Sequence, residues 1–130
     1  MIGLAIRTRS DFPKVLARAK KGSVESLGHA GGLIRKVARH SIRRSPVASA
    51  PGTPPHTRRG QLKAAILYAV EKARESVVIG PDYGVMGLSA MPHEFGGRYR
   101  RQRYPRRPFM GPALENVRDR LPRLWAASVR

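Results

Sequence analysis

The apolar pattern between Val24 and Ile42 constrains the fold of this chain more than any other stretch. Its apolar residues recur at intervals of three and four positions: Val24, Leu27, Ala30, Ile34, Val37, Ala38 and Ile42. Most of the cations in this stretch, such as Arg35 and Arg39, fall on the opposite side. The pattern predicts an amphipathic helix of about 20 residues, roughly 30 Å long.

The residues before this helix predict two further elements. Period-two alternation over residues 2–6 indicates a short strand. Pro13 suits the first turn of a separate helix that ends near residues 20–22, and Ser23 then caps the long helix. Glycines between residues 28 and 32 leave two alternatives for the long helix: close approach of another backbone, or a frayed and kinked first half.

The middle of the chain predicts a long loop and a hairpin. Four prolines exclude a helix or a central strand over about 44–60. Alternation predicts a strand over residues 61–70, although its alanines also permit a helix. β-Branched residues predict a second strand over residues 76–80, antiparallel to the first. The sequence over 85–95 favours a short helix that ends at Gly96.

The stretch from Arg98 to Arg107 is the most basic part of the chain. Six of its ten residues are arginine and none is acidic. Because these cations repel one another, we expect a solvated loop or hairpin unless an anionic partner covers it. Tyr99 and Tyr104 lie between them and either pack or stack on bases. The residues expected to contact DNA or an acidic partner are Arg98, Arg100, Arg101, Arg103, Arg106 and Arg107.

The last helix is expected to begin near Pro112, which suits a first helical turn. Pro122 should kink this helix or end its regular part. We expect Phe109, Leu114 and Trp125 to anchor the helix, with its end covering the sheet.

The composition limits the class of protein. A chain of 130 residues suits one domain, residues 1–130, with a modest core. It has 26 Lys plus Arg against 8 Asp plus Glu, a formal net charge of +18, which indicates nucleic acid or an acidic protein surface as partner. The alternative is a merely solvated surface, encoded by a GC-rich genome that uses arginine freely. The sequence has no cysteine and no apolar run long enough to span a membrane, and its first twelve residues are not expected to act as a secretory signal.

The sequence offers little for catalysis. Its histidines stand at positions 29, 40, 56 and 93, in four different segments, without the spacing of a metal site. No nucleophile motif or phosphate-binding glycine pattern accompanies them. We therefore expect no enzyme activity, no metal and no cofactor.

Four motifs occur in a fixed order. They are Pro-Gly-Thr-Pro-Pro-His-Thr-Arg-Arg-Gly-Gln-Leu (51–62), Val-Ile-Gly-Pro (78–81), His-Glu-Phe-Gly-Gly (93–97) and Arg-Pro-Phe-Met-Gly-Pro-Ala-Leu (107–114). In this order and spacing, over about residues 34–125, the chain resembles the head–tail joining proteins of tailed phages. These are also called tail-completion, neck or minor tail proteins, of the virion morphogenesis kind. The arginine-rich insert and the glycine-rich early helix depart from the family pattern.

The resemblance implies an α+β subunit: a small antiparallel β-sheet packed by a long amphipathic helix and a C-terminal helix, with long basic loops over about 44–60 and 96–108. It implies a structural virion protein that assembles in the host cytoplasm. Six or twelve copies would form a ring in the neck or at the tail end, between the portal or connector and the tail tube or terminator. The expected interface residues are Pro51, Pro54, Pro55, His56, His93, Glu94, Phe95, Tyr99 and Tyr104.

Two functions follow from this sequence. In the first, the ring surrounds the DNA channel, and its basic segment faces either DNA or acidic partners. In the second, the chain is a stand-alone nucleic-acid-binding protein that uses segment 98–107. The two differ in salt dependence, since phosphate contacts weaken steeply with salt.

Overall fold

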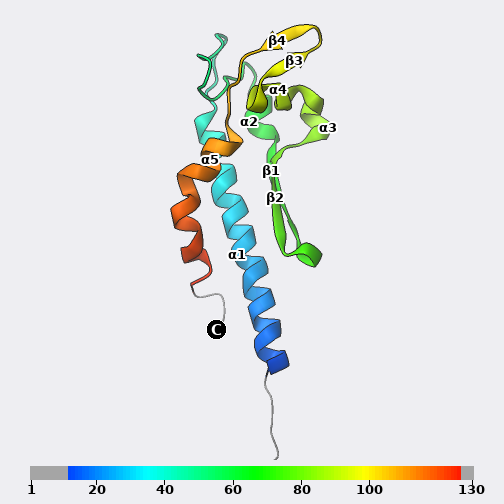
Figure 1. The fold of residues 1–130 in the computed structure, drawn as a ribbon, viewed down its shortest axis with the longest axis vertical. Coiled ribbons are helices and arrows are strands. Elements are labelled where there is room, and N and C mark those ends of the chain that lie inside the picture. Colours follow the sequence, from blue (N-terminus) through cyan, green and yellow to red (C-terminus); the bar gives the residue numbers. More distant parts are fainter. Residues whose placement is uncertain (1–11, 127–130) are drawn as a thin grey trace, which may run out of the picture.

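A single long helix, α1 (Phe12–Ser41), forms the axis of the computed structural model, which describes residues 12–126. The C-terminal helix α5 (Met110–Val117) lies along one side of α1, and a hairpin of β1 (Ile66–Glu71) and β2 (Ser76–Pro81) lies along the other (Figure 1). The architecture is α+β, as predicted, with helices and small antiparallel sheets.

The two helices predicted before residue 42 are one continuous helix, so the predicted break near Gly22 was wrong. A single glycine weakens a helix by about 1 kcal/mol. A break at Gly22 would require a second helix to start after it, and starting a helix is unfavourable. The helix therefore continues through Gly22. The strand predicted over residues 2–6 lies outside the described residues.

The predicted hairpin is present. β1 pairs antiparallel with β2, with Tyr68 opposite Ile79, and a 3₁₀ turn, η1 (Lys72–Arg74), joins them. Residues 61–65 form a short helix, α2 (Gln61–Ala65), instead of the first half of a strand. The spacing of Leu62 and Ala65, which are both buried, suits a helix and decides against the strand.

Short helical pieces connect the hairpin to a second one. They are α3 (Tyr83–Met86), η2 (Gly87–Ser89) and α4 (Ala90–Phe95). The predicted stop at Gly96 is confirmed, with φ of 74° at that glycine. Strands β3 (Gly97–Tyr99) and β4 (Gln102–Tyr104) then form the hairpin that the arginine-rich sequence allowed.

The C-terminal helix packs differently from the prediction. Pro112 lies in its first turn, and its α-helical part ends before Pro122, in the 3₁₀ segment η3 (Arg118–Leu124). The helix end was expected to cover the sheet, but α1 stands between α5 and the β1–β2 hairpin (Figure 1). Near the end of η3, Ser26 Oγ donates a 2.8 Å hydrogen bond to the Leu124 carbonyl, which holds this segment against α1.

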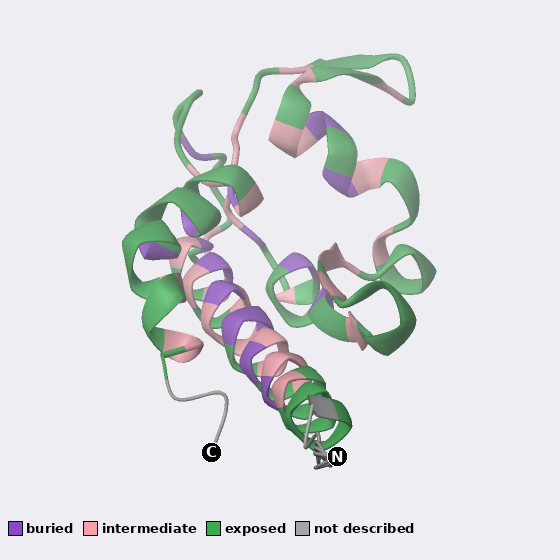
Figure 2. Ribbon diagram, turned by 60° about the horizontal axis from the view of Figure 1, so that its bottom comes forward, coloured by how far each residue is buried: buried purple, intermediate pink, exposed green. Residues whose placement is uncertain are grey.

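The core lies where one end of α1 meets α2, β1 and α5. Its buried members are Ile34, Ala38, Ile42, Leu62, Ile66, Ala90, Phe109, Ala113 and Val117. In Figure 2 the buried residues of α1 form a stripe along one side of the helix. Phe109 is 1% exposed, which confirms it as an anchor, but Leu114 is 45% exposed and is not one. Ala113 and Val117, one helical turn apart, occupy the inward face instead. Trp125 is half-buried.

One glycine of α1 allows the hairpin to approach closely. A Cβ at Gly31 would stand 2.7 Å from the Tyr68 ring and 2.9 Å from Val77. A Cβ at Gly28 would make ordinary contact, 4.0 Å from Val70. Close approach, rather than a frayed helix, is therefore the role of Gly31.

These two glycines give a matched pair of variants. Gly31→Ala is expected to lower the free energy of unfolding by about 1–3 kcal/mol, since the hairpin must shift. Gly28→Ala should raise it by up to about 1 kcal/mol through helix propensity. Urea unfolding of both variants checks this. Equal effects would show that the hairpin does not approach α1 at Gly31.

Candidate functional site

The carboxylate of Glu94 joins two of the sequence motifs. Glu94 Oε2 accepts hydrogen bonds from the backbone N–H groups of Phe109 and Met110, at 2.8 Å and 3.0 Å, and Oε1 accepts one from Gly111 at 2.9 Å. These amides are the free donors at the start of α5, which has no side-chain cap of its own and no acidic residue in its first turn. Glu94 therefore caps the helix from 15 residues upstream.

Backbone contacts bring a third motif to the same place. The Arg107 N–H donates to the His93 carbonyl at 2.6 Å, and the Gly52 N–H donates to the Arg106 carbonyl at 2.8 Å. Arg107 Nε also donates to the Ser49 carbonyl at 2.8 Å. The proline-rich loop, the His-Glu-Phe-Gly-Gly turn and the start of the last helix therefore meet at one end of the molecule. We call this meeting point, formed by residues 49–57, 93–97 and 106–111, the loop junction.

The predicted loop over 44–60 is held by its own chain. Arg44 and Thr57 form an isolated bridge, and the Ser45 N–H donates to the Thr57 carbonyl at 3.0 Å. Ser49, Pro55 and Thr57 are buried. Pro55 was expected at an interface, but its burial within this chain removes its side chain from any partner. Pro51 is exposed, and Pro54 and His56 are partly exposed.

An aromatic row supports the arginine-rich hairpin. The ring centroids of His93 and Tyr104 are 5.7 Å apart, and those of Tyr104 and Tyr99 are 6.4 Å apart. Both tyrosines are half-buried, so the alternative in which they pack fits better than free stacking platforms. The Arg100 guanidinium lies 5.3 Å from the centre of the Tyr99 ring, within cation–π range.

The hairpin itself places its cations unfavourably. Arg98 stands directly opposite Arg103 across the two strands, where like charges destabilise a sheet. Arg100 and Arg101 form the turn with φ of 48° and 66°, a conformation that asparagine and glycine adopt more easily. The four arginines are exposed. An anionic partner would relieve the repulsion, and strain retained in this way is typical of functional segments.

The six predicted cations divide into two groups. Arg98, Arg100, Arg101 and Arg103 are exposed and available to a partner, and Arg106 is exposed although its Nε donates to the Glu94 carbonyl at 3.3 Å. Arg107 is half-buried and bonded to the Ser49 carbonyl, so it holds the loop junction together instead. Glu94 likewise serves the helix cap, and Phe95 is the most exposed of the predicted interface side chains in this turn.

A pocket of about 430 Å³ opens beside the loop junction. Its lining consists of His56, Thr57, Arg58, Arg59, Gln61, Leu62, Met86 and His93. Within the described part of the chain, no three His, Asp or Glu side chains gather as a metal site would require. Over the same residues, no helix is long and apolar enough to cross a membrane.

His93 is a partly buried histidine of the loop junction whose surroundings disfavour its charged form. Burial, together with the nearby Arg107 guanidinium, lowers the pKa of His93 from its ordinary 6.5. Its Nδ1 is buried without a hydrogen-bond partner. The folded chain therefore favours neutral His93.

This shift predicts a pH dependence of stability. Below pH 6.5 the unfolded chain binds a proton at His93 that the folded chain resists, so the free energy of unfolding should fall as the pH falls below 6.5. Above pH 6.5 His93 is neutral in both the folded and the unfolded chain, so it no longer changes the free energy of unfolding with pH. His93→Gln should flatten this part of the profile, because it removes the group whose pKa differs between the folded and unfolded chain. Urea unfolding across this range checks the prediction, and an unchanged profile in His93→Gln would contradict it.

Sequence reasoning missed the role of Glu94. A signal was present: Glu94 is the one acidic residue between Asp82 and Glu115. The helix that follows begins with Phe-Met-Gly-Pro, which lacks a capping side chain, so a distant carboxylate was needed. A comparison with protein-family models, curated proteins and solved structures finds no match for this chain.

Proposed function

We propose that this chain is a structural virion protein, a neck or tail-completion subunit that forms a ring between the head and tail of a tailed phage. The observation that carries the proposal is the loop junction. Three motifs of the family that the sequence resembles lie far apart along the chain, yet they meet here through Glu94, Arg107 and Gly52. A structural subunit needs loops that are held in a fixed arrangement, because it acts by presenting contact loops to its neighbours and not by catalysis.

The arginine-rich hairpin supports a position near DNA or an acidic partner. It extends from the loop junction, beyond α4, at one end of the molecule (Figure 1). Five exposed arginines and the repelling Arg98–Arg103 pair favour a neighbouring anionic surface. In a ring, this hairpin would meet either DNA in the channel or acidic residues of the portal, connector, tail tube or terminator.

Quantitative mass spectrometry of purified, nuclease-treated phage particles tests the proposal. We expect a small fixed copy number per particle, in a multiple that matches a ring of six or twelve. A chain absent from particles, or present in amounts that vary between preparations, would overturn the proposal.

A second candidate function is stand-alone nucleic-acid binding through the same hairpin. The exposed arginines of the turn favour it, since phosphate contacts need only accessible cations. In this case the affinity for duplex DNA should fall steeply as salt rises, in proportion to the phosphates contacted. A ring held by apolar contacts should be much less sensitive to salt.

Replacing the two turn residues of the hairpin tests whether its charge is needed for binding without disturbing its fold. Replacing Arg100-Arg101 by Asn-Gly should keep or slightly raise the stability, because these residues suit a turn with positive φ. The same change should weaken binding to DNA or to the acidic partner. Replacing the exposed Arg118 and Arg120 by glutamine is the control, since it removes the same charge elsewhere. Thermal unfolding and DNA binding at two salt concentrations give the readouts, and equal loss of binding in both variants would contradict a specific role.

A further inference from the structure

One segment of this basic chain is free of lysine and arginine. Residues 75–97 contain no lysine or arginine, the longest such stretch in the sequence, and include three acidic residues. This stretch forms β2 and the helical pieces α3, η2 and α4. In a chain with a formal net charge of +18, the charge is therefore strongly segregated.

The same stretch exposes large apolar side chains. Five of them are between 55% and 72% exposed, and we call them the apolar patch: Tyr83, Val85, Leu88, Met91 and Phe95. Leu88, Met91 and Phe95 recur at intervals of three and four residues, which places them on one side of the helical segment. Ala90 and Pro92 of the same segment are buried, so the opposite side faces the core.

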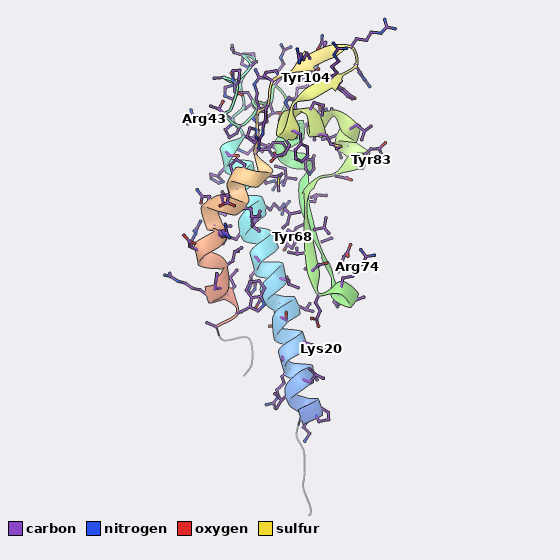
Figure 3. All side chains as sticks on the ribbon, viewed as in Figure 1. Lys20, Arg43, Tyr68, Arg74, Tyr83 and Tyr104 are labelled. Atoms are coloured by element: carbon purple, nitrogen blue, oxygen red, sulfur yellow. The ribbon has the colours of Figure 1, made fainter. Side chains whose placement is uncertain are left out.

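The apolar patch lies on the side of the molecule away from α5. Figure 3 shows Tyr83 at the outer edge of α3, beyond the β1–β2 hairpin. On that hairpin Leu67 and Val78 are also exposed, whereas Tyr68 points toward the glycines of α1. Several large apolar side chains on one exposed segment are typical of a protein–protein contact, whereas single ones are ordinary.

We propose that the apolar patch is a subunit contact that receives a cation-bearing face of a second copy of this chain. Charge identifies the occupant. The segment that carries the apolar patch, residues 82–96, has no lysine or arginine to repel the cations of another copy, and Asp82 at its start is exposed. The burial of the five apolar side chains supplies the driving force.

This contact is heterologous, because an apolar face on a segment without cations meets a different, basic face. A heterologous contact repeats from copy to copy and closes into a ring when the rotation allows. The inference therefore rests on the proposed ring function and names the surface through which its subunits meet.

Sedimentation velocity of the full chain over a wide concentration range tests the contact. We expect the wild type to self-associate, and Leu88→Glu/Met91→Glu to remain monomeric. Leu88→Met/Met91→Leu, which keeps the surface apolar, should self-associate as the wild type does. Thermal unfolding should show that all three chains are folded, since the replaced side chains are more than half exposed. A wild type that stays monomeric throughout, or a glutamate variant that still associates, would overturn the proposal.

A mixing experiment tests the heterologous geometry. The glutamate variant keeps the basic face and can still bind the apolar patch of the wild type. An excess of the variant should therefore block further association of fluorescently labelled wild type and lower the mass of the labelled species. If the variant does not affect the labelled wild type, the two patches meet each other and the heterologous contact is wrong. Neither result depends on phage particles, so failure here and failure of the copy-number test are distinguishable.

Discussion

Replacing Phe109 by alanine is expected to lower the free energy of unfolding by about 3–5 kcal/mol. The ring of Phe109 is 1% exposed and belongs to the core cluster that includes Ile42, Ile66 and Val117. Its removal would leave a cavity where α1, β1 and α5 meet, and such sites collapse only in part. For a chain of this size, a loss of this amount is a large fraction of typical total stability.

The matched control is Leu114→Ala on the same helix. Leu114 is 45% exposed and points away from the core, so its truncation should change the free energy of unfolding by less than about 0.5 kcal/mol. Urea denaturation of both variants, followed by tryptophan fluorescence, gives the comparison, since Trp125 is the one tryptophan of the chain. Similar losses in both variants would show that the last helix is anchored through its outer face, contrary to the structure.

The parts of the fold that the sequence predicted are those governed by local periodicity. The stripe from Val24 to Ile42 is on α1, and the β-branched run after residue 75 is β2. Gly96 ends a helix because it takes a positive φ, as a glycine at this position should. Mutual repulsion predicted that the arginines would be solvated, and the β3–β4 hairpin exposes them.

The errors come from choices that depend on distant packing. Leu114 fits an apolar stripe as well as Val117 does, and the side that is buried is decided by where α1 lies. Residues 61–65 alternate as a strand would, but burial of Leu62 and Ala65 in the core makes them a helix. The candidate site shows the same dependence on distant packing. The sequence motifs indicated which segments form it, but the role of Glu94 follows only from its contact with the start of α5.

Removing the carboxylate of Glu94 should have the second largest effect. Glu94→Ala leaves the N–H groups of Phe109, Met110 and Gly111 without their acceptor and takes a negative charge from the start of α5. Charge-assisted hydrogen bonds and helix capping each contribute on the order of 1–3 kcal/mol, and they overlap here, so we expect a loss of about 2 kcal/mol. Glu94→Gln should lose less, because its amide oxygen still accepts a hydrogen bond.

Glu115→Ala on the same helix is the control for loss of a carboxylate. Its side chain is 68% exposed and lies 3.8 Å from Arg118, so its removal should cost less than about 0.5 kcal/mol. Urea denaturation of the three variants orders them, with Glu94→Ala least stable. Because Glu94 joins the His-Glu-Phe-Gly-Gly turn to the start of the last helix, its loss should also loosen the base of the arginine-rich hairpin. Equal stability of Glu94→Ala and Glu115→Ala would mean that water replaces the carboxylate at little cost, and the loop junction would then be held by Arg107 and the backbone alone.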